Sequence, residues 1–137
     1  MVFAVNTLRK PKAPAQVAIT LIGDEVIPSE VTLALGIEAS RAFKKGDVVE
    51  GPPAHPRPWG LWSLEVDDVE VAAAAQRLLS TIGEASARLR SVAKQMSAQV
   101  TLSIWWDSPE GQGGFSVPPE TLGSLCALVD RVDVYLP

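Results

Sequence analysis

Five segments with a strand pattern constrain this chain more than any other feature of its sequence. The clearest is 98–106, in which Val100, Leu102 and Ile104 alternate with polar residues. Successive strand residues point to opposite faces of a sheet, so this alternation is typical of a strand with one buried face. The other segments that predict strands are 16–23, 40–43, 61–66 and 132–136.

Helical spacing of apolar residues fills the intervals between these strands. It predicts helices over residues 28–35, from Asp68 to Gly83, over 84–96 and over 118–129. Pro28 suits a first helical position, and Gly36 supplies a left-handed stop. The apolar side of the last helix includes Leu122, Leu125 and Cys126, so we expect Cys126 in the core.

The order of these elements predicts an α+β fold, a two-layer sandwich with helices on one face of a five-stranded, mixed or mostly antiparallel sheet. Its beginning follows the βαββαβ order of ferredoxin-like folds, to which one helix and one strand are added. A chain of 137 residues fits one domain. We expect residues 15–137 to form it, preceded by an N-terminal arm over residues 1–14.

Composition argues against several classes of protein. The net charge of −4 argues against general binding of nucleic acid, which usually needs a basic surface. One His and one Cys cannot assemble the usual set of metal ligands, and no cofactor motif occurs. The single Cys fits a reducing compartment, and no apolar run is long enough to span a membrane. We therefore expect a cytoplasmic protein without a cofactor, a metal or a membrane partner.

No catalytic signature stands out in the sequence. His55 and Cys126 lie on unrelated elements, so a Cys–His nucleophile is not indicated. The neighbouring carboxylates Asp67 and Asp68 fit helix capping better than acid–base chemistry. We expect the chain not to be an enzyme.

One face of the predicted sheet carries residues suited to recognition. If the alternation holds, the face opposite the helices displays hydroxyls and two aromatic rings, those of Thr20, Ser63, Thr101, Ser103, Trp105 and Tyr135. Aromatic side chains give a large contact area at low entropy cost, so this surface favours protein binding. The alternative is that Trp105 is covered by the N-terminal arm or by a second copy.

The stretch from Gly46 to Val66 gathers rare residues in a Pro-rich loop that enters a strand. One hypothesis places a pocket under the 46–60 loop, lined by Arg41, Asp47, His55 and Trp59. There Arg41 would bind a carboxylate or phosphate. The alternative is a structural pair of Arg41 and Asp47, with Trp62 in the core.

Several short motifs occur together in a recognisable order. They are Gly23-Asp24 with Pro28-Ser29-Glu30-Val31, Ser40-Arg41-Ala42-Phe43, Lys45-Gly46-Asp47, Trp62-Ser63-Leu64, Gly114-Phe115-Ser116 and Val132-Asp133-Val134-Tyr135. In these motifs the chain resembles the bacterial domain of unknown function (DUF) 4279 family over about residues 16–137. The resemblance implies an uncharacterised bacterial domain and no enzyme class.

These observations leave several functions open. The leading hypothesis is a non-enzymatic protein-binding domain of unknown specificity, of the bacterial immunity or antitoxin type. One alternative is a small-molecule-binding domain or weak enzyme that uses the loop pocket. The other is a structural homodimer joined along the sheet or its edge strand.

Overall fold

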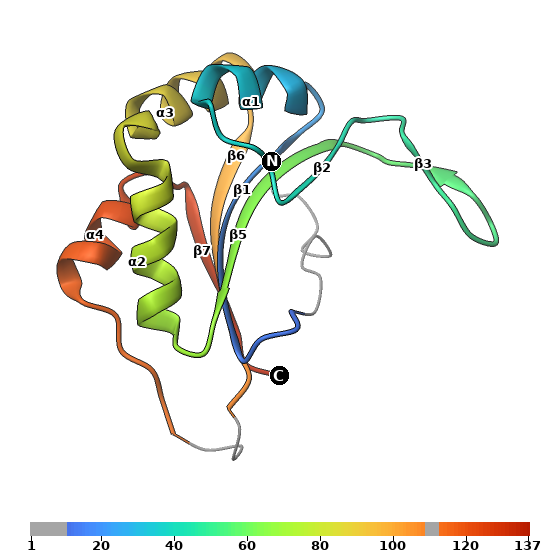
Figure 1. Ribbon diagram of the computed structural model, residues 1–137. Coiled ribbons are helices and arrows are strands. Elements are labelled where there is room, and N and C mark those ends of the chain that lie inside the picture. Colours follow the sequence, from blue (N-terminus) through green and yellow to red (C-terminus); the bar gives the residue numbers. More distant parts are fainter. Residues whose placement is uncertain (1–10, 109–112) are drawn as a thin grey trace.

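The protein folds into two layers, a five-stranded sheet and a set of helices on one of its faces (Figure 1). The computed structural model describes residues 11–108 and 113–137. The sheet contains β1 (Ala15–Gly23), β2 (Arg41–Phe43), β5 (Gly60–Asp68), β6 (Gln99–Trp106) and β7 (Arg131–Tyr135). The helices are α1 (Pro28–Leu35), α2 (Val71–Ile82), α3 (Ser86–Gln95) and α4 (Pro119–Cys126), and a short 3₁₀ turn, Gly83–Ala85, joins α2 to α3.

The strand order is β2-β5-β1-β6-β7, with β1 in the centre. Every neighbouring pair is antiparallel except β6 and β7, which run parallel. The parallel pair is possible because α4 forms the crossover between them. The predicted two-layer α+β sandwich with a mixed five-stranded sheet is confirmed, and α4 and β7 extend the ferredoxin-like βαββαβ order at one edge.

The core lies between the sheet and the helices. From the central strand, Val17, Ile19 and Leu21 are buried against the helix layer, and α2 and α3 add Leu78 and Leu89. This is the face that the alternation predicts to be apolar.

Trp62 is the largest fully buried side chain, as expected for the anchor of the core. Its ring lies on the helix side of β5, and its Nε1–H donates a hydrogen bond of 3.1 Å to Oγ1 of Thr32 in α1. A buried indole N–H needs such a partner, so this bond lets a large ring occupy the core without an unsatisfied donor. It also ties α1 to the sheet.

The prediction for the last helix is wrong in one respect. Cys126 is exposed, and Leu122 is also exposed rather than buried. The residues that turn inward are Thr121, Leu125 and Leu128. Their spacing of four and three residues is also helical, so the buried side is rotated by about one position from the predicted one. Helix α4 packs against α2, and this contact decides which side is buried.

Asp68 organises the junction between β5 and α2, but the prediction that Asp67 or Asp68 caps this helix is wrong. The N-cap residue of α2 is Glu70, and no side chain makes a capping hydrogen bond there. Oδ1 of Asp68 accepts hydrogen bonds from the backbone N–H of Val69 (2.7 Å) and Glu70 (3.4 Å). Its Oδ2 accepts a bond of 3.0 Å from Nη1 of Arg77. Because Arg77 and these two N–H groups stabilise the charged form, the pKa of Asp68 is lowered.

This lowered pKa predicts a pH-dependent contribution of Asp68 to stability. A carboxyl whose pKa is lowered on folding stabilises the fold above its ordinary value of 3.8, and the contribution is lost as pH falls through the folded pKa. Denaturant unfolding of wild type and Asp68→Asn at a series of pH values measures it. We expect Asp68→Asn to be less stable at pH 7 and the difference to shrink below the ordinary value. A difference that is constant with pH would contradict this role.

Candidate functional site

The structure brings all six residues of the predicted recognition surface to one face of the sheet. Thr20 lies between Ser63 on β5 and Thr101 on β6. Farther along the same face, Trp105 pairs in register with Tyr135 on β7. We call this side the open face, because no helix among the described residues packs on it (Figure 1).

Burial divides these six residues into two groups. Thr20, Ser63 and Thr101 are buried, and the hydroxyls of Thr20 and Ser63 share a hydrogen bond of 2.9 Å. Ser103, Trp105 and Tyr135 are half-buried and retain accessible surface. A partner can therefore reach the β6–β7 side of the open face, whereas the hydroxyls near β1 and β5 satisfy one another inside the protein.

Trp105 and Tyr135 form the aromatic part of this accessible region. Their ring centroids lie 6.4 Å apart with an interplanar angle of 29°, so the two rings stack. A stacked pair is held rigid by its own packing, and it offers apolar area together with an indole N–H and a phenol O–H. Such residues often dominate the energy of a protein interface.

Strand β7 carries an ion pair that we did not predict from the sequence, and it lies near the two aromatic rings. Nη2 of Arg131 contacts Oδ2 of Asp133 at 2.7 Å, and Nε donates to the same oxygen at 3.2 Å. The register places both residues on the open face, beside Thr101 and Ser103. Their spacing of two residues, in phase with Tyr135, was the signal in the sequence that could have revealed them.

Burial and the neighbouring charges of this ion pair shift the pKa of Tyr135. Burial raises the pKa of the phenol, and the negative charge of Asp133 raises it further. The hydrogen bond to Asp133 also raises the pKa of Arg131. At neutral pH Tyr135 is therefore an uncharged phenol, and Arg131 carries its charge.

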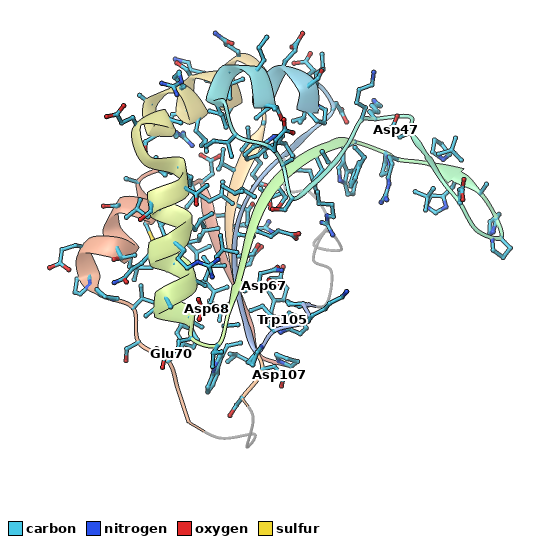
Figure 2. The ribbon with its side chains drawn as sticks, viewed as in Figure 1. Asp47, Asp67, Asp68, Glu70, Trp105 and Asp107 are labelled. Carbon is cyan, nitrogen blue, oxygen red and sulfur yellow. The ribbon has the colours of Figure 1, made fainter. Side chains whose placement is uncertain are left out.

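Two exposed carboxylates lie at the same end of the sheet as Trp105. Figure 2 shows Asp67, at the end of β5, and Asp107, after β6, at the same end as Trp105. Oδ1 of Asp67 accepts a bond of 2.8 Å from Nε2 of Gln16 on the neighbouring strand. The backbone N–H of Asp107 bonds to the carbonyl of Pro14 at 2.8 Å, which fixes the chain there. We call Asp67, Trp105, Asp107, Asp133 and Tyr135 together the acidic–aromatic end.

The four residues of the predicted loop pocket lie in three different parts of the structure. Asp47 and His55 belong to a projecting ribbon formed by β3 (Val48–Val49) and β4 (His55–Pro56) (Figure 1). The carboxylate of Asp47 accepts a bond of 2.8 Å from the backbone N–H of Lys44, and His55 is exposed. Arg41 instead lies on the open face opposite Ser63. Trp59 is half-buried at the entrance to β5.

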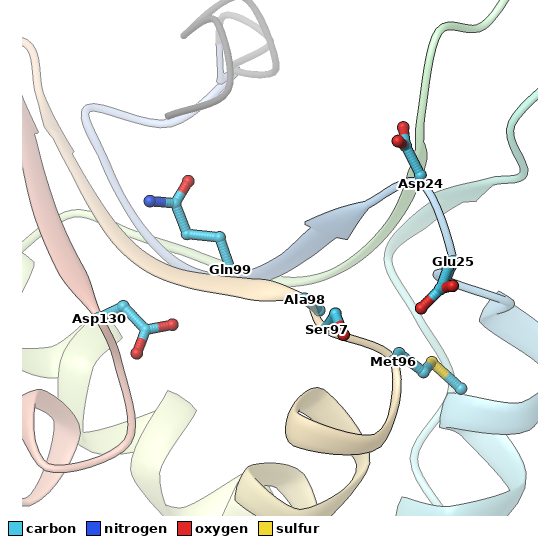
Figure 3. Close-up of a pocket in the computed structure, with 7 residues that line it drawn as sticks. All are labelled: Asp24, Glu25, Met96, Ser97, Ala98, Gln99 and Asp130. Atoms are coloured by element: carbon cyan, nitrogen blue, oxygen red, sulfur yellow. The ribbon is translucent and has the colours of Figure 1, made fainter. Parts of the chain in front are cut away.

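A cavity lies elsewhere, where the end of β1 meets the beginnings of β6 and β7 (Figure 3). It has a volume of about 540 Å³, a size that suits a small molecule. Asp24 and Glu25 stand at one side, and Gln99 and Asp130 at the other. Asp130 already has a structural task, because its Oδ2 accepts a bond of 2.9 Å from the backbone N–H of Val100. A pocket for a small molecule under the 46–60 loop stays a prediction.

Neither a cluster of metal ligands nor a membrane-spanning helix occurs in the described part of the chain. Among residues 11–108 and 113–137, the acidic, His and Cys side chains form no group of three or more that could hold a metal ion. No helix within the same ranges is long and apolar enough to cross a membrane.

Comparison with known proteins adds one relationship. The profile of a family described as "Domain of unknown function (DUF4279)" matches residues 13–135. This span covers nearly all of the domain and confirms the resemblance seen in the short motifs. No curated protein and no solved structure matches the chain.

Proposed function

The chain belongs to the DUF4279 family, and from this premise we propose that it is a non-enzymatic protein-binding domain whose binding site is the acidic–aromatic end of the open face. The stacked rings of Trp105 and Tyr135, half-buried on an open sheet face, carry the proposal. They combine the apolar area and the hydrogen-bonding groups that interface anchors use.

The charges around the rings favour a partner segment rich in Lys and Arg. Asp67 and Asp107 are exposed, and Asp133 lies between the rings and Arg131. A basic side chain over Trp105 would gain a cation–π contact of about 0.5–2 kcal/mol and could reach one of these carboxylates. The net charge of −4 would also speed the encounter with a basic partner.

An immunity or antitoxin role is one form of this proposal. Such a protein needs only to bind and occlude its target, so it requires no catalytic group. A folded acidic domain with a rigid aromatic anchor meets that requirement. The family description names no activity that would favour another role.

Replacement of Trp105 by alanine tests the proposal. We expect Trp105→Ala to weaken binding of a basic partner by about 30-fold or more, the effect of losing an anchor worth roughly 2 kcal/mol. The measurement is titration with a library of Lys- and Arg-rich peptides and with their charge-reversed counterparts, followed by capture from the native lysate. Binding should also weaken as salt rises, because the carboxylates are exposed.

Trp59→Ala is the matched control, since Trp59 is also half-buried but lies outside the acidic–aromatic end. It should bind as the wild type does. Equal binding of basic and acidic peptides, or binding that survives Trp105→Ala, would refute the proposal. If Trp59→Ala lost binding and Trp105→Ala did not, the result would instead favour a binding site at the 46–60 loop, as in the small-molecule or enzyme alternative.

A further inference from the structure

The edge strand β7 leaves apolar side chains uncovered on the helix side of the sheet. Val132 and Val134 are 41% and 50% exposed, whereas their neighbours on β6, Leu102 and Ile104, are buried. Helix α4 follows β6 in the chain but packs against α2, and Val132 and Val134 stay exposed on the helix side of β7. An edge strand presents unpaired backbone N–H and C=O groups, so exposed apolar side chains along it favour strand pairing between chains.

The uncovered area extends beyond the two valines. Eight large hydrophobic side chains are exposed in the described part of the chain, and four of them fall within residues 122–136. These four are Leu122 on α4, Val132 and Val134 on β7, and Leu136 just after it. Val132, Val134 and Leu136 lie on one side of the β7 edge, and we call these three the β7 patch. Single exposed apolar residues need no explanation, but a concentration along one sheet edge indicates an interface.

The charges on the other side of β7 suggest what covers this edge. Arg131 and Asp133 lie two residues apart on the open face, with Val132 between them on the helix side. In an antiparallel pair of two β7 strands with Val132 opposite Val132, each Arg131 faces the Asp133 of the second copy. The same strand thus presents two charges that complement those of an identical strand.

From this self-complementarity we propose that β7 pairs antiparallel with β7 of a second copy of the chain, so that two sheets join into one. A two-fold axis at Val132 would relate the copies, as in most homodimers. The two valines would meet on the helix side, and Arg131 and Asp133 would form two ion pairs across the axis. Both open faces would then lie on the same side of the joined sheet. This inference does not depend on the proposed basic partner.

The molar mass in solution tests the pairing. Light scattering of the full chain across micromolar concentrations should give twice the 14.6 kDa of one chain. Val132→Lys should give a monomer, because the two Lys side chains would face each other at the two-fold axis. The matched control is Leu33→Lys on α1, where the side chain is 85% exposed and far from β7 in the fold; it should remain a dimer.

A charge exchange tests the register itself. Arg131→Asp alone places Asp opposite Asp, and Asp133→Arg alone places Arg opposite Arg, so each variant should dissociate at least tenfold more readily than wild type. When the two are mixed, every cross-strand pair is again Arg with Asp, and a one-to-one heterodimer should form. A monomeric wild type, a dimeric Val132→Lys or a mixture that fails to associate would each overturn the proposal.

Discussion

Trp62→Ala is expected to lower the free energy of unfolding by about 3–5 kcal/mol, the usual cost of removing a buried aromatic side chain. The ring of Trp62 is fully buried, between the central part of the sheet and the helix layer. Alanine would leave a large cavity and would leave Oγ1 of Thr32 without the indole donor. Since domains of this size are stable by about 5–15 kcal/mol, much of the fold's stability depends on this residue.

Two further variants show how much of the lost free energy of unfolding comes from packing and how much from the hydrogen bond. Trp62→Phe keeps most of the ring contacts, and Thr32→Val removes only the acceptor of the bond. We expect Thr32→Val to cost about 1–2 kcal/mol, because the indole N–H would stay buried and unpaired. Urea unfolding measures all three. A Trp62→Ala protein within about 1 kcal/mol of wild type, on the order of measurement error, would show that Trp62 does not anchor the core.

Gly60→Ala is the second substitution with a large expected effect. A Cβ at Gly60 would overlap the backbone oxygen of Val26, far inside van der Waals contact. The obstacle is backbone rather than a flexible side chain, so the entrance to β5 or the turn after β1 must shift. We expect a loss of about 3 kcal/mol in the free energy of unfolding, at the upper end of overpacking effects.

Gly123→Ala gives the matched control for this clash. Gly123 lies in α4, and no heavy atom stands within 4 Å of the position that an alanine methyl group would take there. The same added methyl group should therefore stabilise the protein by about 0.5–1 kcal/mol through helix propensity. Opposite signs for the two variants in urea unfolding are the expected result. A Gly60→Ala protein as stable as wild type would contradict the close approach of β5 to Val26.

The sheet could be predicted well because the alternation of apolar and polar residues within each strand shows which side is buried. In 98–104 and 62–66 apolar residues alternate with polar ones, and a shift by one position would expose the whole core side. The side on which Trp62 and Trp105 lie follows directly from this period of two. The sequence of helix α4 indicates its buried side less clearly, since residues on both sides of its apolar stripe have similar hydrophobicity. Contact with α2 decided the outcome there, and Cys126 was placed wrongly.

The candidate site was predictable only in part. Alternation places Ser103, Trp105 and Tyr135 on one face, but it cannot say that Thr20, Ser63 and Thr101 on that face are buried. Burial depends on what the neighbouring strands and segments cover, which is a tertiary property. The acidic–aromatic end likewise arises where the ends of β5 and β6 lie on either side of the start of β1, and those residues are about 40 apart in sequence.

The central claim is that a protein partner binds the acidic–aromatic end, and photo-crosslinking tests it most directly. A photoreactive amino acid at Ser103 would sit on the accessible side of the open face beside the rings, whereas one at His55 would sit on the exposed β3–β4 ribbon. After irradiation in the native lysate, the proposed site predicts a discrete adduct from position 103 in which the captured segment is rich in Lys and Arg. An adduct from position 55 with none from position 103 would contradict it.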